Sequence, residues 1–121
     1  MSVDGARTGY DDEGVSAHEA DVTFTRIDNE GECILAVHGD LDIAVSAAFR
    51  RSLDELLDLG IQRVGVDLSG VVFMDSSALS VLVHAHERSR EHGQRLELLD
   101  PSPACAKVLR ITGLDRVFDV R

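Results

Sequence analysis

The chain has 121 residues, which suits a single domain, and 44% of them are hydrophobic, which is enough to build a core. Its formal net charge of −10 argues against binding to nucleic acid or to an anionic membrane surface, because both require clustered Lys and Arg. Cys33 and Cys105 have no CxxC spacing, so we expect small core residues in a reducing compartment. With no signal-peptide pattern and no long apolar run, the sequence predicts a cytoplasmic protein.

The first 20 residues differ from the rest of the chain. They show no sustained periodicity and carry five carboxylates against the single Arg7, namely Asp4, Asp11, Asp12, Glu13 and Glu19. Such a composition buries too little apolar surface to fold by itself. We therefore predict a disordered acidic tail over residues 1–20 and a single domain over residues 21–121.

The first predicted elements are a hairpin and a helix. Alternating side chains over residues 22–25 predict a half-buried strand, and the apolar residues 33–37 predict a second strand antiparallel to it. An amphipathic helix follows and ends before Gly60. Its predicted apolar face consists of Val45, Phe49, Leu53, Leu56 and Leu57.

Two further strand–helix pairs complete the chain. Residues 63–68 predict a strand, Ser69–Gly70 a turn, and the stretch after Asp75 a second helix. A strand around residues 96–98 precedes a third helix that begins after Ser102. Because helices connect neighbouring parallel strands, this order predicts an α/β fold with a mixed sheet of four to five strands and helices packed on it.

The junction from Val72 to Ser80 is the strongest local signal. An apolar run ends on Asp75, which is well placed to cap a helix, and Ser76 and Ser77 then fall in the first turn. Free backbone N–H groups and the helix dipole favour an anion there, so the pattern is typical of a serine that accepts a phosphate. The alternative is an ordinary N-cap followed by two serines without a special role.

The sequence offers no pattern for a metal or cofactor. His84, His86 and His92 do not form a pair at i, i+4, so we expect no metal site. A glycine-rich phosphate loop is also missing, and we expect no cofactor. Ser76 lacks the GxSxG context of a serine hydrolase, so we expect a protein that is not an enzyme.

Four separated motifs occur in one unbroken order from about Asp21 to the C-terminus. They are Gly39–Asp42, Val64–Gly70, Phe73–Ser77 and Ile111–Phe118. Together they resemble the STAS domain family, and within it most closely the bacterial anti-sigma factor antagonists. The resemblance implies the STAS fold.

The resemblance also implies a partner-switching role. In this family the unmodified antagonist binds an anti-sigma factor, which is itself a serine kinase, and thereby releases a sigma factor. The kinase phosphorylates the first serine after the Asp, which here is Ser76 (Ser77 is the weaker candidate), and the complex dissociates. A metal-dependent serine phosphatase then restores the active form.

The residues expected to contact the partner surround this serine. They are Asp40, Asp42, Asp75, Ser76, Ser77, Ala78 and Leu79. For Asp40 and Asp42 the alternative is a loop carboxylate that caps the first helix. Asp67 and Ser69 are expected to form a structural turn.

The chain departs from the family pattern in two places. Ala78 stands where the family usually has glycine, and the family's usual C-terminal helix is expected to be absent after Arg121. Apolar surface exposed by that absence makes either a monomer or a weak dimer compatible with the sequence. Because STAS modules also accompany transporters, a subunit that regulates a transporter or lipid-transport complex is the alternative function.

Overall fold

A computed structural model describes residues 16–19 and 22–121 of the chain. The described strands form one sheet in which spatial order follows sequence order. The strands are β1 (Ser16–Glu19), β2 (Val22–Asn29), β3 (Glu32–Leu41), β4 (Arg63–Met74), β5 (Arg95–Leu99) and β6 (Asp119–Val120). The first three pair antiparallel, and β3 to β6 pair parallel, as the two hairpins and three crossovers require.

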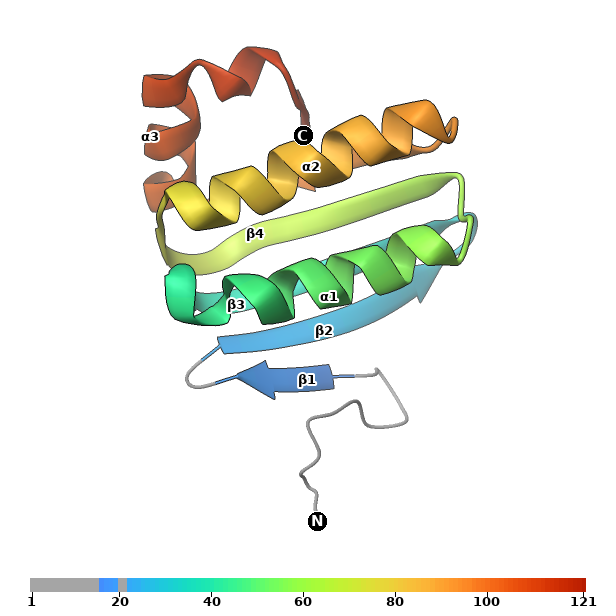
Figure 1. Ribbon diagram of the computed structural model, residues 1–121, viewed down its shortest axis with the longest axis horizontal. Coiled ribbons are helices and arrows are strands. Elements are labelled where there is room, and N and C mark those ends of the chain that lie inside the picture. The colour runs from blue at the N-terminus through green and yellow to red at the C-terminus, as the bar shows by residue number, and fades with distance from the viewer. Residues whose placement is uncertain (1–15, 20–21) are drawn as a thin grey trace.

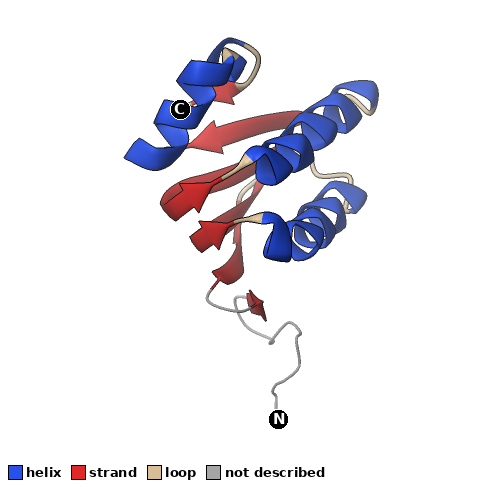
Figure 2. Cartoon of the chain, turned by 60° about the vertical axis from the view of Figure 1, so that its left-hand side comes forward, coloured by secondary structure: helices blue, strands red, loops and turns tan. Residues whose placement is uncertain are grey.

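Three α-helices connect the parallel strands. They are α1 (Ser46–Asp58), α2 (Ser76–Glu91) and α3 (Pro103–Thr112), and two 3-10 turns, η2 (Ile43–Val45) and η3 (Leu114–Arg116), precede α1 and follow α3. Figures 1 and 2 show α1 and α2 side by side on one face of the sheet, with α3 beside the N-terminal end of α2. The predicted mixed α/β sheet with packed helices is confirmed.

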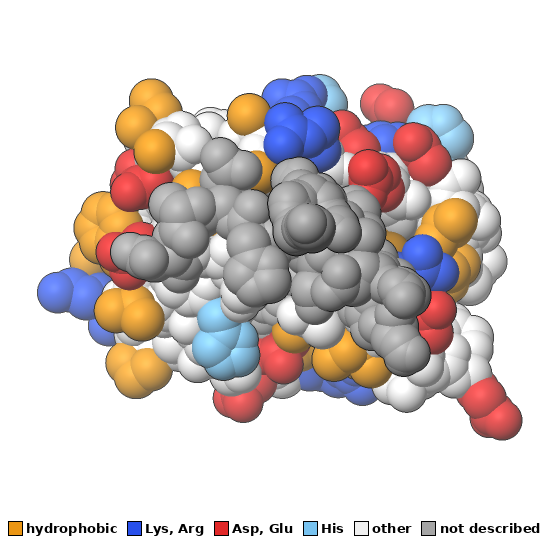
Figure 3. Space-filling view, turned by 90° about the horizontal axis from the view of Figure 1, so that it is seen from below, with side chains coloured by type: hydrophobic (Ala, Val, Ile, Leu, Met, Phe, Trp, Pro, Cys, Tyr) orange, Lys and Arg blue, Asp and Glu red, His pale blue; other side chains and the backbone are white. Residues whose placement is uncertain are grey.

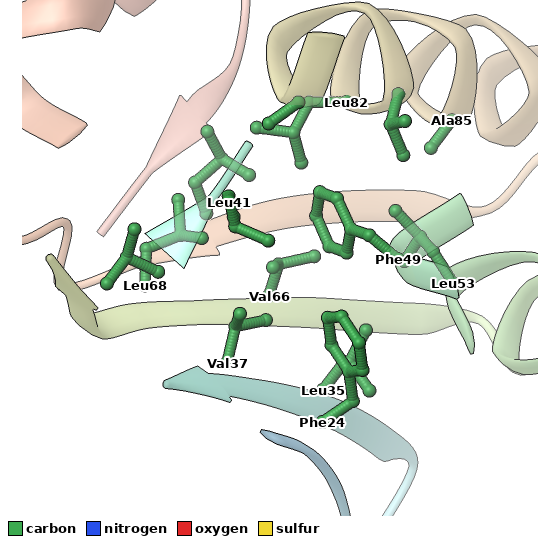
Figure 4. Packing of buried hydrophobic residues seen from close by; sticks show 14 of the residues in the cluster. Phe24, Leu35, Val37, Leu41, Phe49, Leu53, Val66, Leu68, Leu82 and Ala85 are labelled. Carbon is green, nitrogen blue, oxygen red and sulfur yellow. The ribbon is translucent and has the colours of Figure 1, made fainter. Parts of the chain in front are cut away.

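The hydrophobic core lies between the sheet and the helices α1 and α2. Phe24 of β2 stacks on Phe49 of α1, with ring centroids 5.9 Å apart, and Leu82 and Ala85 of α2 point toward the sheet (Figure 4). Every residue of the predicted apolar face of the first helix is buried. The sequence pattern therefore identified correctly which side of that helix faces the sheet.

Two short edge strands extend the sheet beyond the predicted four to five strands. Strand β1 pairs with β2 from Ser16 opposite Thr25 to Glu19 opposite Val22. It lies within the predicted disordered tail, so that prediction is wrong for residues 16–19, whereas residues 1–15 lie outside the described residues. The reason is that backbone pairing with a neighbouring strand orders a four-residue segment whose composition carries no strand signal.

The predicted turn at Ser69 and Gly70 is also wrong, because β4 continues through both residues to Met74. The ladder with β3 shifts its register between Ala36 and His38, which places Gly70 opposite His38. A Cβ atom on Gly70 would lie 2.6 Å from the His38 ring. The glycine thus marks a close approach within a strand, a role that single-sequence patterns do not separate from a turn.

Beyond α3, the described chain forms η3 and then β6 beside β5. The Arg121 N–H donates to the carbonyl of Leu98 at 2.8 Å, and the Asp100 N–H donates to the carbonyl of Arg121 at 2.7 Å. This last segment is therefore held along the β5 edge. The predicted absence of a further helix stays a prediction.

Candidate functional site

The carboxyl ends of the parallel strands meet at one end of the molecule, on the left in Figure 1. At this end β3 leads into η2 and β4 leads into α2, and Leu41 pairs with Met74. The Asp75 N–H donates to the carbonyl of Leu41 at 3.2 Å. The turn that carries Asp42 and Ile43 is therefore fixed beside the first turn of α2, at the edge where α/β sheets commonly bind their ligands.

Asp75 is the N-cap of α2, as predicted. Its carboxylate accepts hydrogen bonds from the Ser77 hydroxyl (2.5 Å), the Ser77 N–H (2.9 Å) and the Ala78 N–H (3.4 Å). These bonds, with the Ser77 hydroxyl as the largest contribution, hold the pKa of Asp75 below its usual range. The carboxylate is thus charged at neutral pH and satisfies two of the free N–H groups at the helix start.

The two serines after the cap differ in accessibility and in bonding. The Ser77 hydroxyl is half-buried and donates to Asp75. Ser76 is exposed, and within the described residues its hydroxyl has no hydrogen-bond partner. Phosphorylation of Ser77 would require its bond to the cap to break, whereas the Ser76 hydroxyl is free to meet a phosphoryl donor.

Large hydrophobic side chains are exposed at the same end of the molecule. Ile43 of η2 is 76% exposed, and Val72 and Phe73 of β4 are 70% and 48% exposed. In Figure 3 hydrophobic and acidic side chains lie together at the left end. We call Ile43, Val72 and Phe73 the apolar patch.

The apolar patch was missed in the sequence, where residues 71–74 look like an ordinary buried run. Its exposure follows from the lengths of the strands. Pairing of β4 with β5 ends at Asp67 opposite Leu99, while β4 continues beside β3 to Met74. Val72 and Phe73 thus lie on a stretch that has no paired strand on one side. A sequence signal for this would have been the short length of β5 relative to β4.

The remaining predicted partner residues occupy different environments. Asp42 caps η2, since its carboxylate accepts from the Ala44 N–H at 3.0 Å. Asp40 is exposed, and its position in β3 is opposite Phe73. Ala78 is fully buried and Leu79 is 8% exposed, so these two side chains offer little surface to a partner.

Asp67 and Ser69 lie in the middle of β4, several residues before the strand end that leads to Ser76. The Asp67 carboxylate accepts from the Ser69 N–H at 2.9 Å, so the pair forms a local turn-like bond, although within a strand. This contact lies within β4 and involves no residue of the first turn of α2.

Ser76 also lies at one end of a shallow groove of about 410 Å³ along α2. Leu79, Val83 and Leu114 of η3 supply its apolar lining, while His84 and Glu87 supply polar groups. The groove thus continues the surface around Ser76 along the helix.

Two classes of site find no support in the described part of the chain. There, no three His, Cys, Asp or Glu residues are grouped so that they could hold a metal ion. Among the same residues, no helix has both the length and the apolar character needed to cross a membrane.

Comparison with known proteins identifies the family. The model of the STAS domain matches residues 23–121. The anti-sigma-F factor antagonist RsfB of Mycobacterium tuberculosis is 24% identical over 80% of this chain and 79% of its own length.

Two solved structures share the fold. An anti-sigma factor antagonist from Mycobacterium paratuberculosis superposes with a TM-score of 0.76 at 23% identity, over 82% of this chain and 84% of that chain. The Bacillus cell fate determinant SpoIIAA in its phosphorylated form has a TM-score of 0.63 at 21% identity, over 81% of this chain and 90% of that chain. With a family match that spans nearly all of the described residues, this chain belongs to the STAS domain family.

Proposed function

We propose that this chain is a cytoplasmic anti-sigma factor antagonist whose binding to an anti-sigma factor is switched off by phosphorylation of Ser76. The observation that carries the proposal is the difference between two adjacent serines. The Ser76 hydroxyl is exposed and free, whereas the Ser77 hydroxyl donates a hydrogen bond to Asp75. Its relatives support the role, since RsfB is named an anti-sigma-F factor antagonist. A protein of the same fold, SpoIIAA, has been solved with its phosphate.

The apolar patch supplies the docking surface for the anti-sigma factor in this proposal. Ile43 and Val72 are 76% and 70% exposed and Phe73 is 48% exposed, and Asp40 and Asp42 flank them. A partner with an apolar centre and basic residues around it would complement this surface. The unmodified serine is small and adds no charge, so it permits close contact.

A phosphate on Ser76 would act on docking and not on the fold. It adds about 1.5 to 2 negative charges at a helix N-terminus, where the helix dipole tolerates an anion. Asp75 directly precedes Ser76, and the turn that carries Asp42 is fixed beside the same helix start, so the phosphate increases like-charge repulsion at this surface. Bulk, repulsion and the cost of desolvating the phosphate would together weaken the complex by orders of magnitude.

In this mechanism the chain is a ligand and a kinase substrate, not a catalyst. The anti-sigma factor is the serine kinase that transfers the phosphoryl group from ATP to the Ser76 oxygen, which loses its proton. A serine phosphatase hydrolyses the ester and returns the antagonist to its binding form. The side chains at the site have only to hold Ser76 accessible to the kinase. Asp75 does this by fixing the first turn of α2 through its hydrogen bonds to the Ser77 and Ala78 N–H groups.

The test is intact-mass analysis after incubation with the anti-sigma kinases encoded in the same genome and Mg-ATP. We expect one added phosphate on the wild type and on Ser77→Ala and Ser80→Ala, and none on Ser76→Ala. The unmodified chain should bind the same kinase, and Ser76→Glu should bind it at least tenfold more weakly. Phosphate on Ser76→Ala, or equal affinity for both forms, would refute the switch.

A further inference from the structure

A second hollow lies at the far end of α2 from Ser76, between the last turns of that helix and the β5–β6 edge. Its volume is about 340 Å³, which is within the range of small-molecule sites. His86 and Arg90 of α2 line one side, and Arg95 of β5 and Asp119 of β6 line the other. Ser76 and Arg90 are 14 positions apart on one helix, or roughly 20 Å at about 1.5 Å per residue, so this hollow is separate from the proposed phosphorylation site.

The positive charges of this hollow are only partly neutralised. Arg90 is exposed and forms no ion pair within the described residues. Arg95 forms its ion pairs through Nε, with Glu97 at 3.2 Å and Asp119 at 3.4 Å, and its side chain stays 59% exposed. In a chain of net charge −10, two guanidinium groups on one concave surface form a local site that attracts anions.

The wall of the hollow also contains a polar atom without a partner. Nδ1 of His86 is buried and has no hydrogen-bond partner among the described residues. The ring is held edge-on against Phe118, with centroids 5.3 Å apart at 75°. The His86 ring is therefore a fixed part of the wall of the hollow, held by its contact with Phe118.

Apolar surface borders the same hollow. Val117 lines it and is 50% exposed, although the residue that follows, Phe118, is buried. Leu96 of β5 forms another part of the lining. A ligand with a small apolar body could cover Val117 while its anionic group meets the arginines.

We propose that this hollow binds a small organic anion, with its phosphate or carboxylate group between Arg90 and Arg95 and its apolar part against Val117. Guanidinium groups bind both kinds of anion through two parallel hydrogen bonds. Asp119 keeps Arg95 in place and disfavours a ligand that reaches over it, and the exposed Glu91 beside Arg90 disfavours larger polyanions. The inference is independent of the proposed phosphorylation of Ser76.

The test is an NMR titration of the full chain with phenyl phosphate and with benzoate, which separate the two anionic groups. We expect saturable amide shifts over residues 86–96 and 117–119, with a dissociation constant in the millimolar range or tighter for at least one probe. Benzyl alcohol, which has the ring but no charge, should give no saturable shift. Shifts confined to the Ser76 end, or no saturable shift with either anion, would overturn the proposal.

Two variants complete the test. Arg90→Gln should raise the dissociation constant about tenfold, because it removes one charged hydrogen bond. Arg51→Gln is the matched control, since Arg51 is also an exposed helical arginine but lies on α1. Equal weakening by both variants would show that the anion is attracted only by overall charge and would refute the site.

Discussion

Asp75 determines both where α2 begins and how the two adjacent serines differ. Its carboxylate accepts the Ser77 and Ala78 N–H groups and the Ser77 hydroxyl, which leaves Ser76 as the free hydroxyl. Asp75→Ala should lower the free energy of unfolding by about 1 kcal/mol, the usual cost of a lost N-cap. Ser76→Ala should change it little, because its hydroxyl is exposed and has no partner within the described residues. Urea denaturation measures the free energy of unfolding of both variants. An equal loss of stability in the two would contradict the assignment of Asp75 as the cap and Ser76 as the free hydroxyl.

The cap also makes stability depend on pH in a defined window. The pKa of Asp75 is lowered from the model-peptide value of 3.8 because the Ser77 hydroxyl and backbone N–H groups bind the charged form. A carboxylate with a lowered folded pKa stabilises the protein above its unfolded pKa, and this contribution disappears as the pH falls through the folded pKa.

We therefore expect the wild type to exceed Asp75→Asn in stability at neutral pH. The difference should be constant down to about pH 5 and should shrink below about pH 4. Denaturation curves for both proteins from pH 7 to about pH 3 measure this difference. Asp100→Asn is a suitable control, since that exposed carboxylate is not a cap of α2. A difference that grows on acidification would contradict the role of the charged cap.

At the scale of elements, the caps and the apolar faces of the helices could be predicted from the sequence, because both are local. Asp75 and Ser102 cap α2 and α3 as expected, and Gly113 ends α3 in the left-handed conformation. The paths of the strands were harder to predict. The edge strands β1 and β6 have four and two residues, which is too short for a periodic pattern.

The candidate site also has one part that could be predicted from local sequence and one part that could not. Ser76 could be identified because its motif is contiguous, and the assignment of its phosphorylation stays a prediction. The apolar patch could not be found, because its exposure depends on β5 ending before β4 does. That is a relation between two strands about 30 residues apart, which no local pattern records.

The contact between Gly70 and His38 offers a test of the corrected β4 path. An added Cβ at position 70 would lie 2.6 Å from the His38 ring, so the ring must move away. Gly70→Ala should destabilise the protein by about 1–2 kcal/mol, as overpacked positions do. The same substitution in a His38→Ala background should cost less than half as much. A double-mutant cycle by urea denaturation measures this coupling, and additive effects would show that the ring does not confine position 70.

At the scale of the whole molecule, one buried carboxylate connects neighbouring strands with the C-terminal segment. Glu97 of β5 is 3% exposed and lies within 3.4 Å of Arg63 of β4, Arg95 and Arg121, while Arg121 also reaches Glu32 of β3 at 3.1 Å. The C-terminal segment beside β6 is thus joined to the sheet centre by charge as well as by backbone hydrogen bonds.

Glu97→Ala should therefore destabilise the molecule and loosen its C-terminal edge. The expected loss is about 2 kcal/mol, less than for a fully buried pair, because the arginines are half exposed and regain water. Amide hydrogen exchange should accelerate in β6 more than in β2. Glu55→Ala, at an exposed position of α1, is the control and should change neither quantity. Unchanged exchange at Val120 would mean that the ion pairs do not hold this edge.

The apolar patch is the feature by which the whole molecule would meet its partner, and it can be tested apart from the phosphate. Ile43→Ser and Val72→Ser remove side chains that are 76% and 70% exposed, so the free energy of unfolding should change by less than about 0.5 kcal/mol. If an anti-sigma factor docks there, each variant should weaken binding about tenfold, since exposed apolar anchors commonly contribute more than 1 kcal/mol to an interface.

Ile111→Ser is the matched control for the apolar patch, because Ile111 is 71% exposed but lies on α3. Calorimetric titration with the kinase proposed to modify Ser76 compares the three variants directly. Weakening confined to Ile43→Ser and Val72→Ser places the partner over the strand ends beside Ser76, where a phosphate must interfere with it. Weakening only by Ile111→Ser would move the partner to α3 and would require the phosphate to act through α2 rather than by direct repulsion.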